Sequence, residues 1–264
     1  MELIYITNSP ELAISAETAG IDRIMVDLEI LGKKARQGHL NTLISDHCVK
    51  DVEDIRSVLK LSKLLVRVNP INERSEIEIN DVIRLGADII MLPMFKSRSE
   101  VDLFIRLVGG RVKTCLLLET REALFDIDNI LSIKGIDEIH IGLNDLHLSM
   151  GLSFMFELLS NGVIEMLSKK IVKVGLKFGF GGVARFGTGD LDSSLILSEH
   201  IRLNSSMVIL SRDFKKDNVD LKGEVIKIRE YFNYEKSDIT LTNNKYMAFE
   251  SINKIVNRLK NSFD

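Results

Sequence analysis

Short apolar runs alternate with longer stretches of helical periodicity along most of the chain. Several of the runs are apolar throughout, as in Ile89–Leu92, which is typical of parallel strands buried on both faces. The predicted strands are residues 3–7, 23–28, 64–68, 89–92, 114–118, 138–141, 178–183 and 207–210. Eight strands in 264 residues leave roughly 33 residues for each strand–helix unit, which is the spacing of a (β/α)8 TIM barrel in the α/β class.

A Gly-x-Asp triplet supports this repeat, because it recurs at residues 20–22, 86–88 and 135–137, each time between a helical stretch and a strand. Glycine can end the helix in a left-handed cap, and the strand then begins shortly afterwards. The first helix is predicted to start at Ser9 and Pro10 and to stop at Gly20. Pattern alone does not separate a closed barrel from an open doubly wound sheet. Eight units, and no glycine-rich dinucleotide motif after the first strand, favour the barrel.

The end of the chain has a different character. We expect residues 1–215 to form the barrel core, and residues 216–264 to add the last barrel helix and a C-terminal helical extension within the same domain. Residues 217–233 resemble a helix, residues 234–244 are polar and turn-rich, and helical spacing returns at 246–259. This extension either caps its own barrel or packs on a neighbouring subunit, and the sequence leaves both open.

Composition excludes several classes of protein. A hydrophobic fraction of 45% with 28% charged residues is ordinary for a globular protein, and the net charge of −3 is spread along the chain. A nucleic-acid or membrane-surface binder would normally carry a basic excess. The two cysteines lack metal-type spacing, and neither a signal peptide nor a run of about 20 apolar residues is visible. We therefore expect a soluble cytoplasmic protein.

Charged residues gather where the predicted strands end, which is the end of a barrel that carries chemistry. They are Asp27 and Glu29 at the end of the second strand, Arg67 at the end of the third, Glu119 after the fifth and Asp145 after the sixth. Two carboxylates on adjacent strands, Glu119 and Asp145, can hold Mg²⁺ or Mn²⁺. Arg67 can bind a substrate carboxylate through two parallel hydrogen bonds. The metal ion and this arginine together could bind a 2-oxo acid and stabilise its enolate. The alternative is a structural ion pair between Glu119 and Arg67.

Histidines supply candidates for a general base. The polar segment 32–47 is long for a connection between a strand and a helix, and it holds His39 and His47. Either could act as a base or be a solvated surface residue. His147 is a possible neighbour of the metal site or a packing residue, His140 is expected inside the core, and His200 near a helix end is explained by the helix dipole.

A possible anion site follows the last two strands, where barrels often bind phosphate. Gly182 would let backbone N–H groups approach an anion, and Arg185 and Arg212 would pair with it. The alternative is a tight turn with solvated arginines. The anion interpretation predicts a phosphorylated substrate or a second carboxylate.

Five segments in order, residues 20–29, 66–70, 86–93, 117–120 and 142–146, resemble the HpcH/HpaI aldolase and citrate lyase beta-subunit family of the phosphoenolpyruvate/pyruvate barrel superfamily. The resemblance implies Mg²⁺ or Mn²⁺ on Glu119 and Asp145, and a pyruvate-like carboxylate or enolate on Arg67. It also implies cleavage or formation of a C–C bond next to a carbonyl, and a homo-oligomer.

The chain departs from this family at Ile30, where the aldolase branch has a histidine for acid–base work and the acyl-CoA lyase branch has a second acid. Three functions follow. The first is a metal-dependent pyruvate aldolase that cleaves or forms a 4-hydroxy-2-oxo acid through a pyruvate enolate. The second is an acyl-CoA lyase of the citrate or malyl-CoA type. The third is a catalytically degenerate barrel that binds a metal and a 2-oxo acid.

Overall fold

The computed structural model describes residues 1–32, 47–216, 218–234 and 237–261, and eight parallel strands form its closed barrel. The strands are β1 (Glu2–Ile6), β2 (Arg23–Asp27), β3 (Lys63–Arg67), β4 (Ile89–Leu92), β5 (Lys113–Leu118), β6 (Glu138–Ile141), β7 (Lys177–Val183) and β8 (Met207–Leu210). Each strand pairs with the next, and β8 closes on β1 with Leu3 opposite Val208. The predicted α/β barrel is confirmed, and every predicted strand boundary lies within one residue of the observed one.

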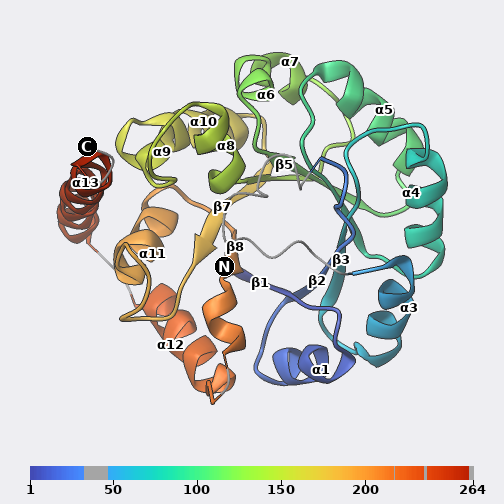
Figure 1. Cartoon of the computed structure of the whole chain (residues 1–264), viewed down its shortest axis with the longest axis horizontal. Coiled ribbons are helices and arrows are strands. Elements are labelled where there is room, and N and C mark those ends of the chain that lie inside the picture. The colour runs from blue at the N-terminus through green and yellow to red at the C-terminus, as the bar shows by residue number, and fades with distance from the viewer. Residues whose placement is uncertain (33–46, 217, 235–236, 262–264) are drawn as a thin grey trace.

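Helices surround the barrel, as the view along its axis shows (Figure 1). They are α1 (Pro10–Thr18), α3 (Val49–Val58), α4 (Ser75–Arg84), α5 (Arg98–Val108), α6 (Arg121–Phe125), α7 (Ile127–Leu131), α8 (Leu143–Ser149), α9 (Glu157–Ser160), α10 (Val163–Lys173), α11 (Ser193–Arg202), α12 (Leu221–Asn233) and α13 (Asp238–Asn261). A short 3-10 helix, Arg212–Lys215, follows β8. The start of α1 matches its sequence signals, because the Ser9 side chain accepts the Leu12 N–H and Pro10 is the first helical residue.

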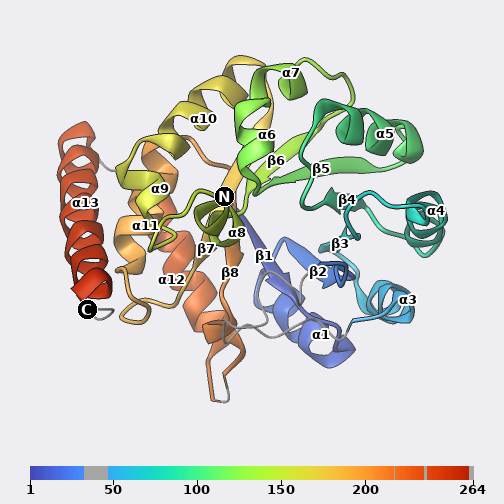
Figure 2. The same ribbon diagram turned by 45° about the horizontal axis from the view of Figure 1, so that its top comes forward.

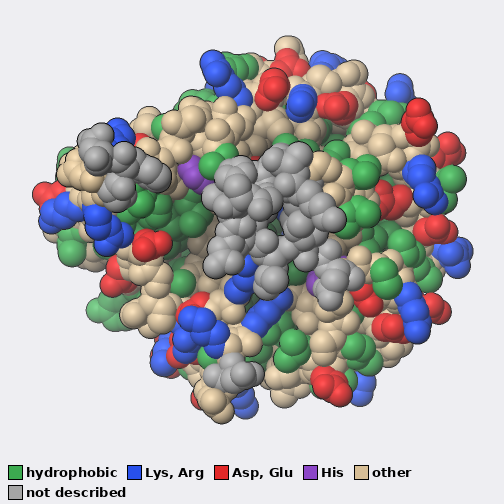
Figure 3. Space-filling view, in the orientation of Figure 1, with side chains coloured by type: hydrophobic (Ala, Val, Ile, Leu, Met, Phe, Trp, Pro, Cys, Tyr) green, Lys and Arg blue, Asp and Glu red, His purple; other side chains and the backbone are tan. Residues whose placement is uncertain are grey.

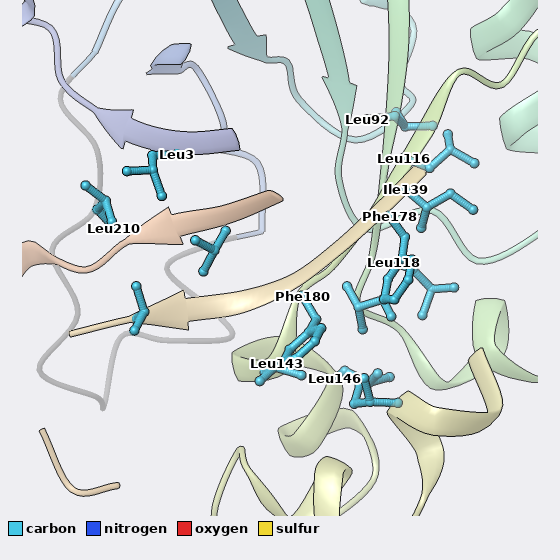
Figure 4. Close-up of a cluster of buried hydrophobic side chains, with 14 of the residues drawn as sticks. Leu3, Leu92, Leu116, Leu118, Ile139, Leu143, Leu146, Phe178, Phe180 and Leu210 are labelled. Carbon is cyan, nitrogen blue, oxygen red and sulfur yellow. The ribbon is translucent and has the colours of Figure 1, made fainter. Parts of the chain in front are cut away.

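Two apolar cores stabilise the barrel. The larger one lies between strands and helices, and Figure 4 shows part of it, with Phe180 of β7 and Leu143 of α8 among its members. The smaller one fills the inside of the barrel with strand residues such as Met25, Leu65 and Met207. Side chains alternate between the two faces of a strand, so each strand contributes to both cores.

A buried ion pair lies at the amino-terminal end of the barrel. Arg23 and Glu138, the first residues of β2 and β6, are 3% and 2% exposed and form a two-pronged pair, with 2.9 Å from Arg23 Nη2 to Glu138 Oε2. Glu2 of β1 also pairs with Arg23. The two buried charges at this end, Arg23 and Glu138, therefore compensate each other.

The Gly-x-Asp repeat has a structural role. Its glycines have φ angles of +92°, +95° and +96°, as the left-handed turn requires. Each aspartate directly precedes one strand and accepts a hydrogen bond from the strand before it. The bonds are Leu3 N–H to Asp22 at 2.7 Å, Leu64 N–H to Asp88 at 2.8 Å and Thr114 N–H to Asp137 at 2.8 Å.

The C-terminal helix differs from the prediction. The segment 234–244 was expected to be turn-rich, but α13 begins at Asp238, where Ser237 Oγ accepts the Thr240 N–H at 3.2 Å. This helix packs on α11 and α9 of the same chain and stands at the outer edge of the molecule (Figures 1 and 2). Asn244 reaches Ser198 at 2.7 Å, so the polar segment is stabilised by contacts far away in the sequence.

No helix in the described part of the chain is long and apolar enough to cross a membrane.

Candidate active site

Arg67 lies at the carboxyl end of β3 within a cluster of acids. Its Nε and Nη2 donate to the two carboxylate oxygens of Asp27 at 2.8 and 2.7 Å, and Nη2 lies 3.4 Å from Glu29 Oε2. Burial lowers the pKa of Arg67, but the charge and hydrogen bonds of Asp27 and the charge of Glu29 outweigh this effect and raise it. Arg67 is therefore a permanent cation, and Nη1 has no hydrogen-bond partner among the described residues. Its ion pairs are with Asp27 and Glu29 and not with Glu119.

Glu119 follows β5 and is 3% exposed. Its Oε1 accepts the Met94 N–H at 3.1 Å, and Met94 directs that N–H from a left-handed backbone conformation with φ of +54°. Burial raises the pKa of Glu119 well above its usual value. The charge of Arg67 lowers this pKa, and the charges of Glu29 and Asp145 raise it further. Glu119 therefore lies in a buried, acid-rich environment that would favour a bound cation.

Gly142 makes room for this carboxylate. A Cβ atom at this position would lie 2.7 Å from Glu119 Oε2 and 2.9 Å from Glu119 Cβ, both closer than side chains tolerate. Gly142 precedes α8, and Asp145 lies in the first turn of that helix. The strand β6 and the turn after it thus set the separation between the two candidate metal ligands.

Glu119 and Asp145 line one cavity of about 300 Å³, together with Lys96 and Glu122 among others. In the described residues no group of three or more histidine, cysteine, aspartate and glutamate side chains is arranged to hold a metal. Two carboxylates are nevertheless a donor set that suits Mg²⁺ or Mn²⁺, which keep waters and substrate oxygens as their other ligands. The residues present therefore fit a hard divalent cation.

His47 contacts the same cluster through the backbone of β2. Its Nδ1 accepts the Asp27 N–H at 2.9 Å, so the neutral ring carries its proton on Nε2. His39 lies outside the described residues, as does most of the polar segment 32–47. Ile30, at the position where the aldolases that the sequence resembles have a histidine, is 55% exposed.

The other histidines do not belong to the cluster. His147 is buried, and its Nδ1 lies 3.1 Å from the Leu143 carbonyl of its own helix. His140 is inside the core, as expected. His200 stacks on Phe180 with ring centroids 3.8 Å apart. Burial lowers its pKa to about 3, helped by the charge of His140. The helix-dipole explanation for His200 is therefore wrong, because the ring is neutral.

The arginines after β7 and β8 have different surroundings. Arg185 Nε donates to Asp213 at 2.9 Å, and Thr188 and Lys216 bind the same carboxylate at 2.6 and 2.5 Å. Arg212 is exposed, and Gly182 lies opposite Ile209 of β8, beyond an irregularity in the pairing of these strands. Arg185 is therefore already paired with Asp213. Arg212 has no ion-pair partner in the described part of the chain.

Two features of the site were not predicted. The Met94 N–H that holds Glu119 and the cavity-lining residue Lys96 both come from the segment after β4, where no site residue was predicted. The one available signal was the proline at position 93, which ends the strand at the rim.

Comparison with protein families identifies a match to the HpcH/HpaI aldolase/citrate lyase family over residues 3–160. Two curated relatives are hydroxypyruvate/pyruvate aldolases. The one from Rhizorhabdus wittichii is 37% identical over 76 residues, which is 26% of this chain and 30% of that protein. The one from Agrobacterium fabrum is 44% identical over 68 residues, 25% of this chain and 26% of that protein. The chain therefore matches less than a third of the length of either relative.

Solved structures share the fold at low sequence identity. An HpcH/HpaI aldolase from Desulfitobacterium hafniense has a TM-score of 0.63 at 16% identity, over 89% of this chain and 94% of that one. An aldolase/citrate lyase family protein from Burkholderia cenocepacia has 0.63 at 14%, over 87% and 92%. The citrate synthase SbnG has 0.62 at 15%, over 89% and 95%.

Proposed function

Because the chain belongs to the HpcH/HpaI aldolase/citrate lyase family, we propose that it is a divalent-metal-dependent carbon–carbon lyase. It would cleave or form a 4-hydroxy-2-oxo acid through a pyruvate enolate. The observation that carries the proposal is that Glu119 and Asp145 line one cavity, and that the permanent charge of Arg67 acts on Glu119. The names of the two curated relatives, both pyruvate aldolases over short matches, agree with this choice of substrate.

Glu119 and Asp145 would hold Mg²⁺ or Mn²⁺, which as a Lewis acid polarises a 2-oxo group when it is bound. The Arg67 Nη1 group would bind the substrate carboxylate, while Asp27 and Glu29 fix the orientation of the guanidinium. The positive charge of Arg67 then lies beside the oxygen on which the enolate charge develops.

Proton transfer needs a further group, and His39 and His47 remain the proposed ones. In cleavage, a base takes the proton of the 4-hydroxyl, the bond between the third and fourth carbons breaks, and an aldehyde leaves. The enolate then takes a proton at its third carbon to give pyruvate. His47 Nδ1 accepts the Asp27 N–H, so the neutral ring carries its proton on Nε2. This arrangement favours His47 as a proton donor over His47 as a base.

The proposal includes a homo-oligomer. The outer side of α13 carries the apolar residues Ile239, Tyr246 and Met247, which are 74%, 65% and 56% exposed. Apolar side chains on an extension beyond the barrel are typical of contacts with another subunit.

Calorimetric titration with oxalate, a planar mimic of the pyruvate enolate, tests the proposed site. The wild type should bind oxalate when Mg²⁺ or Mn²⁺ is present, and Glu119→Gln and Asp145→Asn should each weaken binding by at least about tenfold. Glu122→Gln is the matched control, because Glu122 lines the same cavity and is not a proposed ligand. Folded wild-type protein that binds no oxalate with either metal would contradict the proposal.

A further inference from the structure

We propose that Arg212 and Lys215 form a binding subsite for an oxyanion group at the far end of the aldehyde half of the substrate. The subsite would favour an aldehyde that carries a phosphate or a carboxylate over a neutral one. This inference rests on the proposed function for its substrate, and on the geometry after β8 for its residues.

The two cations are brought together by the local backbone. The 3-10 helix Arg212–Lys215 places them three residues apart, and side chains at this spacing lie one above the other in a 3-10 turn. Partial loss of contact with water lowers the pKa of Lys215, and the charge of Arg212 lowers it further. The structure therefore holds two like charges close together at the end of a barrel strand.

Among the described residues, these cations have no ion-pair partner. The acid on the same turn, Asp213, is bound by Arg185, Thr188 and Lys216. Hydrogen bonds from Arg185, then Lys216, then Thr188 hold the pKa of Asp213 well below its usual range, so it stays charged. Neither Arg212 nor Lys215 forms a hydrogen bond or an ion pair within the described ranges. A bound oxyanion would relieve their repulsion.

The cations lie at the end of the barrel that carries the candidate active site. Lys215 Nζ is 5.6 Å from the centre of the Tyr5 ring on β1, and Asp27 at the end of β2 is close enough to raise the pKa of Lys215. Asp27 is the carboxylate that holds Arg67. On the face shown in Figure 3, Lys and Arg side chains gather over the β8 and α12 side of the barrel.

The order of charged groups suggests how a substrate would lie. The charge of Asp27 acts on Lys215 and on Arg67, the charge of Glu119 acts on Arg67, and the charge of Asp145 acts on Glu119. These charged groups follow one another from β8 to β6. A 2-oxo acid whose carboxylate is bound by Arg67 would have the metal carboxylates on one side and the two cations on the other. The far end of the substrate would then extend toward β8, which is where many barrels bind phosphate.

The first test measures anion binding without any reaction. Inorganic phosphate is titrated into the full chain and followed by calorimetry, for the wild type, Arg212→Met, Lys215→Met and Lys216→Met. Lys216 is the matched control, because it lies on the same turn and is already paired with Asp213. We expect Arg212→Met and Lys215→Met to weaken phosphate binding roughly tenfold each, since each removes a charged hydrogen bond. If Lys216→Met weakens phosphate binding as much as the other two substitutions do, the loss reflects general surface charge, and the subsite proposal is overturned.

The second test compares aldehydes in the aldol reaction with pyruvate. The wild type should use glyceraldehyde 3-phosphate or succinic semialdehyde more efficiently than neutral glyceraldehyde, and the two charged aldehydes distinguish a phosphate from a carboxylate ligand. Arg212→Met and Lys215→Met should lose that preference through KM while keeping their activity with glyceraldehyde. Equal use of charged and neutral aldehydes by the wild type would overturn the subsite and leave the proposed function intact. Loss of all aldol activity would instead contradict the proposed function, and the phosphate titration would still decide the subsite.

Discussion

Gly142 determines where the Glu119 carboxylate can lie. Substitution to alanine would place a methyl group 2.7 Å from Glu119 Oε2, and that oxygen belongs to a proposed metal ligand. We expect Gly142→Ala to weaken metal-dependent oxalate binding by about tenfold or more, because the carboxylate must move away from the cavity.

Gly162→Ala provides the comparison for this prediction. Its φ of +82° makes alanine unfavourable there, but a Cβ atom would meet nothing within 4 Å. We expect that variant to lose about 1 kcal/mol of unfolding free energy and to bind oxalate normally. Similar oxalate binding by Gly142→Ala and the wild type, measured by calorimetry on folded protein, would show that Gly142 does not control the site.

Residues of the candidate site could be predicted from the sequence where their position depends on one strand. Arg67 and Glu119 come at the ends of apolar runs, and all such ends meet at the same rim. Their partners were harder to predict. The Met94 N–H on Glu119 and the Asp213 carboxylate on Arg185 are 25 and 28 residues distant in the chain from the groups that they bind. Such contacts depend on the closed barrel and leave no local pattern.

Strands and helices were predictable to different degrees. Buried parallel strands give continuous apolar runs, so the sequence indicates their centres. One-residue errors occur at both ends of the strands, and at the amino ends strands such as β3 and β5 start with an exposed lysine outside the apolar run. The start of α13 was missed because polar residues interrupt its first two turns and most side chains there are exposed. Contacts such as that between Asn244 and Ser198, which stabilise it, leave no local pattern.

The Gly-x-Asp repeat leads to a prediction about these elements. Asp137 accepts hydrogen bonds from the N–H and the hydroxyl of Thr114, at 2.8 and 3.1 Å. Asp137→Ala would leave the start of β5 without this acceptor. We expect the unfolding free energy to fall by about 1 kcal/mol in urea denaturation, with oxalate binding unchanged, since the bond lies at the end of the barrel away from the site. Asp137→Asn keeps one acceptor oxygen and should recover part of the loss. If the alanine variant is as stable as the wild type, the aspartate does not explain why the triplet recurs, and the glycine alone explains it.

The whole molecule links its folding to pH through two histidines that the closed barrel buries. His140 is 1% exposed and His200 is fully buried, and each has one ring nitrogen without a partner among the described residues. Burial lowers the pKa of His140 to about 4 and that of His200 to about 3. Both rings are therefore neutral in the folded protein at any pH near neutrality. The unfolded chain takes up these protons near the usual histidine pKa of about 6.5.

The sign of the pH effect follows from where the protons bind. Between about pH 6.5 and pH 4 the unfolded state binds more protons at these two sites than the folded state, so their effect is to destabilise the protein as the pH falls. Glu119 acts in the opposite direction, because burial raises its pKa and the folded state then binds a proton that the unfolded state releases. A measurement on the wild type alone would mix the two effects. A substitution that removes one histidine separates them.

His200→Phe keeps a ring stacked on Phe180 and removes the titrating group. Unfolding in urea should show the wild type losing about 2 kcal/mol more than this variant between about pH 8 and pH 5, the linkage expected for one histidine whose folded pKa lies far below 6.5. Ser205 loses its bond to His200 Nδ1 in the variant, which lowers stability equally at every pH and leaves the difference in slope unaffected. Parallel pH profiles for the two proteins would mean that His200 takes up its proton as readily in the folded barrel as in the unfolded chain. The stack on Phe180 would then have to open well above pH 5 without unfolding the barrel.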